Sequence, residues 1–301
     1  MGTTPISEGA VMASVRPLRL TSNLAVAELV ANKGDRRVSV CIPARNEAAT
    51  IAPILLRIKR ELMDAQPLVD ELIVMDHGST DQTAEVALEC GATVIEADSV
   101  LPEFGSALGK GDVLWRSVDA STGDFIVWLD ADLGSFTADY VSGLLEPLLL
   151  DEHLALVRST YRRTFHGEGD EGGRVTELTA RPVLKLLYPE LAHIRQPLGG
   201  EYAIRRDVAL ATRFEVDYGV EMGLLIDIWR AYGVESIAQV DLGARTHRNR
   251  PLSELHEQAI QVMRAALSRT PVLAIADGTF TRPPLNDVAD GLDQSITASM
   301  T

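Results

Sequence analysis

Two aspartates one residue apart, Asp130 and Asp132, directly follow an apolar run at Phe125–Leu129. A run rich in Val, Ile, Phe and Trp is typical of a buried central strand. Carboxylates at the C-terminal end of such a strand lie where open α/β sheets bind their ligands. Two hard oxygen ligands there suit Mg²⁺ or Mn²⁺ held between the protein and a diphosphate. Asp is also common in solvated turns after strands, so the pair alone leaves both interpretations open.

Two further polar loops follow predicted strands upstream of this pair. Pro43–Glu47 leaves the strand at 38–42, and Asp76–Asp81 leaves the strand at 71–75. Because the carboxyl ends of parallel strands meet at one edge of a sheet, we expect both loops to converge with the aspartate pair.

The second loop carries groups suited to a nucleoside. Asp76 can accept a hydrogen bond from a base N–H or a ribose hydroxyl, and Gly78 permits a tight turn. Ser79 or Thr80 can cap the next helix, and a capped turn without a ligand is the alternative. No Gly-x-Gly-x-x-Gly follows the first strand, which disfavours a dinucleotide-binding fold.

Strands alternate with helices in the first half of the chain, which predicts an α/β fold with a doubly wound, mainly parallel sheet. The strands predicted there are 38–42 (ended by Pro43), 71–75, 92–95 and 125–129, and the helices are 23–31, one from residue 47, 81–90 and 109–120. After residue 150 the alternation is irregular. We predict strands at 154–160, 201–206 and 236–241, helices at 175–187, 219–231 and 253–267, and a Gly- and acid-rich loop at 165–173.

Composition excludes several classes of protein. The 28 basic and 43 acidic side chains give a net charge of −15, which argues against a nucleic-acid-binding surface. No apolar run approaches the ~18–20 residues of a membrane span, and the first 19 residues lack the hydrophobic core of a signal peptide. The two cysteines, Cys41 and Cys90, are expected to be small core residues, and a cytoplasmic location is expected.

The three loops together resemble the GT-A nucleotide-sugar glycosyltransferases. That family combines Pro-x-x-Asn-Glu, Asp-x-x-Ser-x-Asp and an Asp-x-Asp metal motif. Here the three motifs are Pro43–Glu47, Asp76–Asp81 and Asp130–Asp132, in the family's order, and this likeness covers residues 38–135.

Four motifs in the second half narrow the resemblance to retaining glucosyl-3-phosphoglycerate synthases of the actinobacterial type. They are Gly172–Leu178, Pro197–Glu201, Tyr218–Glu221 and Thr246–Arg250, and with them the likeness runs from 38 to 270. The resemblance implies a nucleotide-sugar donor half at 36–135 and an acceptor half of the same domain at 136–272. Composition indicates a leader at 1–35 and a flexible tail at 273–301, both outside this likeness.

The resemblance also implies roles for single residues. The metal ligands would be Asp132, His247 and, less directly, Asp130. The donor contacts would be Pro43, Ala44, Glu47, Asp76, Ser79, Lys110, Asp130, Ala131, Tyr218, Glu221, Arg245 and Arg250. The acceptor contacts would be Gly173, Arg174, Thr176 and Asn249, and the residues that contribute to catalysis would be Glu221, Asp132 and Arg174.

The residues themselves support an anionic acceptor. Gly172–Thr176 opens a helix, whose free N–H groups and dipole favour an anion, and Arg174 adds a donor fork for a phosphate or carboxylate. The alternative is that the two glycines only end a flexible loop. His247 lies among arginines that can neutralise a diphosphate, although a lone histidine is more often structural.

Two charged residues have equally good structural interpretations. Glu221 lies near a helix start and can project toward the sugar, or it is a solvated acid that favours the helix dipole. Lys110 can reach a phosphate or the base, or it is an ordinary surface lysine.

The expected reaction is metal-dependent transfer of glucose, with retention, from a nucleoside diphosphate glucose such as UDP-glucose to the hydroxyl of 3-phosphoglycerate. The product, glucosyl-3-phosphoglycerate, would be a precursor of glucosylglycerate and methylglucose polysaccharide. The partners expected are these substrates and a second copy of the chain, with neither nucleic acid nor a membrane span. Alternatives are another GT-A transferase with a mannosyl donor or polyprenyl-phosphate acceptor, and a non-catalytic nucleotide-sugar binding protein. Asp76 does not distinguish uracil from guanine.

Overall fold

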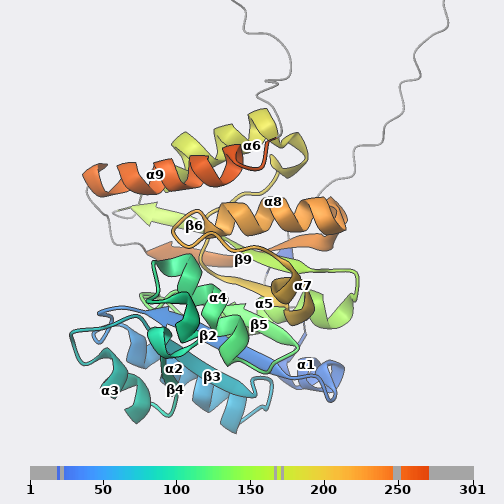
Figure 1. Ribbon diagram of the computed structural model, residues 1–301. Helices are drawn as coiled ribbons and strands as arrows, with labels where there is room; N and C mark the ends of the chain where they lie inside the picture. The colour runs from blue at the N-terminus through green and yellow to red at the C-terminus, as the bar shows by residue number, and fades with distance from the viewer. Residues whose placement is uncertain (1–18, 21–23, 166–167, 171–172, 247–251, 271–301) are drawn as a thin grey trace, which may run out of the picture. The chain divides into compact units, whose positions relative to one another are not determined.

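The computed structural model describes residues 19–20, 24–165, 168–170, 173–246 and 252–270. Within them, the strands join into one sheet in the order β1-β9-β6-β8-β5-β2-β3-β4, and β7 pairs with β6 off this path (Figure 1). The strands are β1 Arg19–Leu20, β2 Val38–Ala44, β3 Glu71–Asp76, β4 Thr93–Glu96, β5 Phe125–Trp128, β6 Leu156–Phe165, β7 Glu168–Asp170, β8 Tyr202–Arg205 and β9 Ile237–Thr246.

The order β5-β2-β3-β4 forms a parallel half of the sheet. Its register places Ala44 beside Asp76, so β2 and β3 end level at the carboxyl edge. Strand β8 runs antiparallel to β5 and β6, and β6 is parallel to β9. The α/β fold with a mainly parallel, doubly wound sheet is therefore confirmed.

Helices cover both faces of this sheet (Figure 1). Helices α1, α2, α3 and α5 contribute to the core on one face, and α4 and α6 to α9 contribute to the core on the other. The strands serve both cores because successive side chains point to opposite faces, as Val40 and Cys41 of β2 do. The helical segments are α1 Val26–Lys33, α2 Ile51–Ile58, α3 Thr83–Glu89, α4 Lys110–Ala120, α5 Asp139–Leu150, α6 Arg181–Leu187, α7 Arg206–Ala211, α8 Val220–Tyr232, α9 Leu252–Leu267, and the π-helical η1 Lys59–Asp64 and η4 Thr176–Ala180.

Strand β2 passes through Pro43, where the sequence predicted its end. The carbonyl of Cys41 accepts from the N–H of Leu129, and that of Ala44 accepts from His77 on the opposite side. Alternation along the strand turns the nitrogen of Pro43 toward β5, which has ended at Trp128. The missing N–H of proline therefore falls where the pairing of β2 with β5 ends.

Several elements were absent from the sequence prediction, among them strand β1 and helix α7. Helix α5 was not predicted, and the expected loop at 165–173 contains the short strand β7. The domain boundaries stay predictions, although Leu29 of α1, within the predicted leader, is fully buried in the core.

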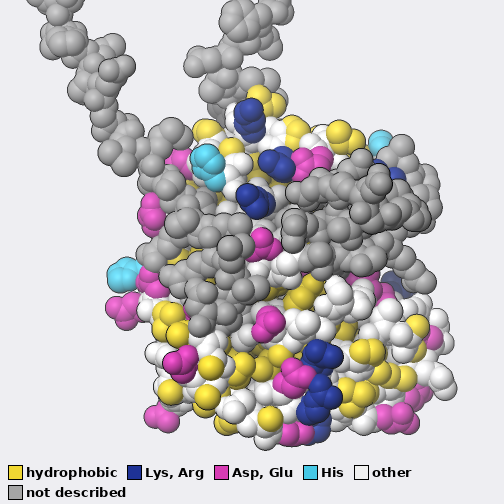
Figure 2. Space-filling view, turned by 180° about the vertical axis from the view of Figure 1, so that it is seen from behind, with side chains coloured by type: hydrophobic (Ala, Val, Ile, Leu, Met, Phe, Trp, Pro, Cys, Tyr) yellow, Lys and Arg dark blue, Asp and Glu magenta, His cyan; other side chains and the backbone are white. Residues whose placement is uncertain are grey.

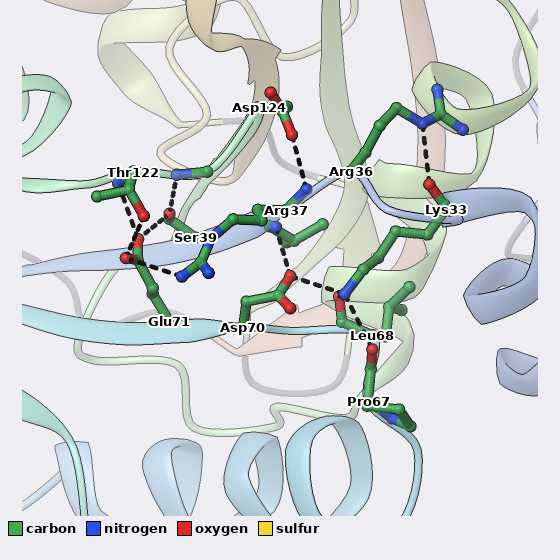
Figure 3. A network of polar contacts seen from close by, with 12 residues as sticks. Lys33, Arg36, Arg37, Ser39, Pro67, Leu68, Asp70, Glu71, Thr122 and Asp124 are labelled. Atoms are coloured by element: carbon green, nitrogen blue, oxygen red, sulfur yellow. Dashed lines mark hydrogen bonds and ion pairs between the residues drawn. The ribbon is translucent and has the colours of Figure 1, made fainter.

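A polar network joins the amino ends of β2, β3 and β5, at the sheet edge opposite the predicted site (Figure 3). Lys33 donates to the carbonyls of Pro67 and Leu68 and forms an ion pair of 2.7 Å with Asp70. Glu71 accepts from the hydroxyl of Ser39 and from Thr122. This network holds the amino ends of the three strands together. The polar loops that carry the predicted site lie at the opposite, carboxyl ends.

Among the described residues, no helix combines the length and apolar character needed to cross a membrane. On the face shown in Figure 2, Asp and Glu side chains are scattered among apolar ones, and Lys and Arg form small separate groups. This distribution agrees with the net charge of −15.

Candidate active site at the carboxyl edge of the sheet

The loops after β2 and β3 are held together by hydrogen bonds. The N–H of Asn46 donates to the hydroxyl of Ser79 (3.0 Å), and the N–H of Thr80 donates to the Asn46 side chain (2.8 Å). The N–H of Glu47 donates to the hydroxyl of Thr83 (2.8 Å). Asn46 has a φ of 58°, a left-handed conformation that Asn tolerates better than most residues. The two loops therefore form one rigid unit, as their convergence predicted.

Asp76 is buried in this unit, at the end of β3. It accepts hydrogen bonds from both the N–H and the hydroxyl of Ser79. Partial desolvation, and then the nearby Asp76 carboxylate, raise the pKa of Glu96 on β4. The structure thus brings Ala44, Asp76 and Ser79, all predicted donor contacts, to one place beside Pro43.

Lys110 lies between two carboxylates that come from distant parts of the chain. Its Nζ is 2.9 Å from Oδ1 of Asp130, after β5, and 2.9 Å from Oε1 of Glu221, in the first turn of α8. The side chain of Lys110 is 19% exposed and that of Glu221 only 4%. Lys110 is therefore no ordinary surface lysine, and Glu221 is no solvated helix-start acid.

Charge governs this cluster. Burial alone would lower the pKa of Lys110, but the carboxylates of Asp130 and Glu221 outweigh it and hold that pKa well above its ordinary value. Lys110 therefore stays cationic throughout the physiological pH range. A permanent cation at the carboxyl edge is suited to a substrate whose negative charge grows during reaction.

The start of α4 is placed by close contact between backbones. The N–H of Asp112 donates to the carbonyl of Val216 (3.0 Å), and a Cβ at Gly111 would overlap the carbonyl of Glu215. Glycine is required there because no side chain fits between the two backbones. The same segment leads into Tyr218, which is partly exposed, and then into Glu221. One contact thus aligns Lys110 with Glu221.

Gly200 lies against the aspartate of the cluster. A Cβ at this position would stand 2.6 Å from Cγ of Asp130 and closer still to both its oxygens. Gly200 belongs to the motif Pro197–Glu201, but no role was predicted for it. The sequence feature that could have pointed to this role is the Gly199-Gly200 pair directly before the predicted strand at 201–206.

Two buried residues beneath the cluster were missed by the sequence reasoning. Arg158 of β6 and Tyr202 of β8 are cross-strand neighbours, and the guanidinium lies 4.9 Å from the centre of the Tyr202 ring. Burial, and then the charge of Glu221, raise the pKa of Tyr202. Within the described chain, the Tyr202 hydroxyl and the Nε and Nη1 groups of Arg158 have no hydrogen-bond partner.

The predicted metal ligands are described only in part. Asp130 and Asp132 flank the buried Ala131, and their oxygens are the donor class that Mg²⁺ and Mn²⁺ prefer. Lys110 donates a hydrogen bond to one carboxylate oxygen of Asp130. This contact is consistent with the prediction that Asp130 is a less direct metal ligand than Asp132. The described residues contain no cluster of three metal-ligating side chains, and His247 lies outside them.

The predicted acceptor residues lie on a different element. Gly173 and Arg174 precede η4, and Thr176 begins it; Arg174 is exposed and Thr176 is buried. The predicted helix at 175–187 is thus π-helical η4 followed by α6. Segment η4 packs against α9, and its proximity to Lys110 stays a prediction.

Three further predicted site residues, His247, Asn249 and Arg250, fall outside the described residues. Arg245 lies on β9, where its backbone pairs with that of Arg163 on β6. Their roles therefore also stay predictions.

Comparison with known proteins gives consistent matches. The family model for "Glycosyl transferase family 2" matches residues 39–199. A glucosyl-3-phosphoglycerate synthase of Mycolicibacterium smegmatis is 48% identical over 248 residues, which cover 81% of each chain.

Solved structures agree with this likeness. Glucosyl-3-phosphoglycerate synthase of Mycobacterium tuberculosis, in complex with Mn²⁺, UDP-glucose and phosphoglyceric acid, is 45% identical, with a TM-score of 0.78 over 88% of this chain and 92% of that one. A structure of the same enzyme with Mg²⁺ and UDP is also 45% identical, with a TM-score of 0.78 over 85% of this chain and 88% of that one.

Proposed function

The chain belongs to glycosyl transferase family 2, and on that premise we propose that it is a metal-dependent, retaining glucosyltransferase. It transfers glucose from UDP-glucose to the hydroxyl of 3-phosphoglycerate and forms glucosyl-3-phosphoglycerate. The observation that carries this proposal is the extent of the likeness. The family match ends at residue 199, whereas 45% identity to an enzyme bound to UDP-glucose, Mn²⁺ and phosphoglyceric acid runs through 88% of the chain.

The donor would bind at the carboxyl edge of β2, β3 and β5. Pro43, Ala44, Glu47, Asp76 and Ser79 would hold the nucleoside, in the unit formed by the first two loops. The remaining donor contacts in this proposal are Lys110, Asp130, Ala131, Tyr218, Glu221, Arg245 and Arg250.

Asp132 and His247 would hold Mg²⁺ or Mn²⁺. Asp130 would contribute less directly, because one of its oxygens already forms an ion pair with Lys110. The ion would supply positive charge for the diphosphate that leaves. Lys110 adds a second, fixed positive charge beside it.

Gly173, Arg174, Thr176 and Asn249 would bind the acceptor. Arg174 offers a planar fork of donors that matches a phosphate or carboxylate. Binding there places the acceptor hydroxyl beside the anomeric carbon, and positioning of this kind lowers the entropic part of the barrier.

Glu221 would act on the sugar. It is buried and paired with Lys110, so it is suited to orient the glucose and to stabilise positive charge that develops on the ring. We favour attack of the acceptor from the face that the leaving group departs from, with a leaving-phosphate oxygen taking the acceptor proton. This accounts for retention without a covalent sugar on Glu221.

We also propose a homodimer. Exposed apolar side chains lie on η4, α6 and α9, three elements that contact one another: Leu178, Leu186, Met263 and Leu267. Single exposed leucines are ordinary, but neighbouring ones on packed helices are typical of an interface.

The experiment is a glucosyl transfer assay on the purified full chain, with UDP-glucose and Mg²⁺, in the presence and absence of 3-phosphoglycerate. We expect UDP release that requires the acid and stops with EDTA. Asp132→Asn should lower kcat by about 10²- to 10³-fold because one charged oxygen ligand is lost. Asp139→Asn, which changes an exposed aspartate on α5, is the matched control and should keep wild-type kcat.

Turnover that proceeds equally without 3-phosphoglycerate would contradict the acceptor assignment. Turnover only with a GDP-linked sugar would contradict the donor assignment and leave the fold unaffected.

A further inference from the structure

Arg158 is a buried cation for which the proposed reaction has no role so far. Its side chain is 1% exposed, and its Nη2 donates to the carbonyls of Pro197 (3.1 Å) and Gly199 (2.9 Å). A buried charge costs much free energy unless it is hydrogen-bonded. Here both partners belong to one short loop, so the cation and the loop hold each other.

That loop leads directly to the site. Gly200 follows Gly199, and its backbone lies so close to the carboxylate of Asp130 that a Cβ would overlap it. The position of the peptide between Gly199 and Gly200 therefore limits where the Asp130 carboxylate can lie. That carboxylate in turn contacts Lys110 at 2.9 Å, and Lys110 contacts Glu221.

We propose that Arg158 is a positioning residue for glucosyl transfer, which keeps Gly200 against Asp130 and so keeps Asp130 at Lys110. The inference rests on the proposed function, because it concerns the same site. Arg158 touches neither substrate in this assignment and acts through the loop.

The chemistry of the side chain explains why arginine suits this task. The flat guanidinium packs over the ring of Tyr202 while it donates to two carbonyls of the loop. Lysine keeps the charge and can reach a carbonyl as a point donor, but it lacks the planar face. Methionine keeps the apolar stem and loses both the charge and the donors.

The first test compares Arg158→Met and Arg158→Lys with the wild type in the transfer assay. We expect Arg158→Met to lower kcat about 100-fold, because a misplacement on the order of 1 Å at a reacting centre has that effect. The KM for 3-phosphoglycerate should not change, since none of the proposed acceptor contacts belongs to this loop. Arg158→Lys should restore part of kcat.

Lys33→Met is the matched control. Lys33 is also a buried cation that donates to two neighbouring carbonyls, those of Pro67 and Leu68, but at the opposite edge of the sheet (Figure 3). We expect both Lys33→Met and Arg158→Met to lower the melting temperature, but Lys33→Met should keep wild-type kcat. A merely structural role for Arg158 predicts the same result for both variants.

Gly200→Ala tests the pathway through the loop. It pushes on Asp130 directly and leaves the Arg158 hydrogen bonds in place, so it should lower kcat in the same way. Because both changes act on the position of Asp130, the double variant should lose little more than the more severe single variant. Multiplicative losses would mean that Arg158 acts by another route and would overturn the inference.

Wild-type kcat in Arg158→Met would also overturn it, provided that the wild type is active. An inactive wild type would instead count against the proposed function. In that event a crystal structure of Arg158→Met tests the positioning role of Arg158 without an activity assay. An Asp130 carboxylate displaced from Lys110 would support the inference, and an Asp130 carboxylate that has not moved would overturn it.

Discussion

At the scale of single residues, the position of Lys110 sets the electrostatics of the site. Two carboxylates that approach the same point would repel each other, and one ammonium between them removes that repulsion. The arrangement holds the side chains of Asp130 and Glu221 on one ammonium group. A charged pair of this kind can hold sugar hydroxyls and a developing positive charge at the same time.

Replacement of this lysine should therefore damage both stability and activity. Lys110→Met leaves Glu221 buried without its cation, so the free energy of unfolding should fall by about 3 kcal/mol. We expect kcat to fall at least ~100-fold, as for other preorganised charges. Urea unfolding and the transfer assay measure the two effects.

Lys59→Met is the control for this change. Lys59 forms an exposed ion pair with Asp64 on η1, and such pairs contribute less than about 1 kcal/mol. It should keep both stability and kcat near wild type. Equal behaviour of the two variants would contradict the role given to Lys110.

The sequence identified Lys110, Asp130 and Glu221 as candidates but did not show that they meet. Each had an equally good surface interpretation, because only the fold brings the starts of α4 and α8 to the end of β5. Arg158 and Tyr202 gave no signal, since an Arg or Tyr within a strand is usually half-exposed. Their importance follows from the antiparallel pairing of β6 with β8, which the sequence did not predict.

At the scale of elements, the helices and strands that could be predicted were those with a strong local pattern of apolar and polar residues. The parallel strands were found because apolar runs end in polar loops, a pattern with a direct physical cause. Helix α5 was missed because it is buried almost all round and contains Pro147. A helix that is apolar on every side has no periodic signal, and an internal proline argues against a helix.

The network at the amino edge makes the sheet sensitive to acid. Desolvation alone would raise the pKa of Glu71, but hydrogen bonds from Ser39 and Thr122, with the charge of Arg37, lower it below 4.5. The unfolded chain therefore binds this proton more readily. The charge of Glu71 contributes its full stability above pH 4.5, and the contribution is lost as pH falls through the lowered pKa.

Glu71→Gln should accordingly be less stable than the wild type by about 1–2 kcal/mol at neutral pH. The difference should shrink below pH 4.5, where the wild type loses the advantage of its charge. Urea unfolding at both pH values measures this convergence. Glu85→Gln, at an exposed position on α3, should match the wild type throughout, and a constant gap for Glu71→Gln would contradict the assignment.

At the scale of the whole molecule, an acidic protein has to bind two anionic substrates. With a net charge of −15, long-range attraction does not assist their approach. Binding therefore has to depend on local cations, and Lys110 and Arg174 lie at the places where the proposal puts the diphosphate and the acid.

The proposed dimer is the last property that belongs to the whole molecule. Leu186 of α6 is 57% exposed and Leu267 of α9 is 45% exposed, and α6 contacts α9. A charge in the centre of an apolar interface leaves an unpaired buried group, which costs several kcal/mol. Leu186→Glu with Leu267→Glu should therefore convert a species of twice the 32.6 kDa chain mass into the monomer in sedimentation equilibrium.

Leu56→Glu gives the matched control for this experiment. Leu56 is 53% exposed, close to the value for Leu186, but it lies on α2, on the other face of the sheet. The same charge there should leave the dimer intact, because exposure alone does not make an interface. A wild type that sediments only as a monomer at micromolar concentration would remove the dimer proposal, and dissociation by Leu56→Glu alone would move the interface to α2.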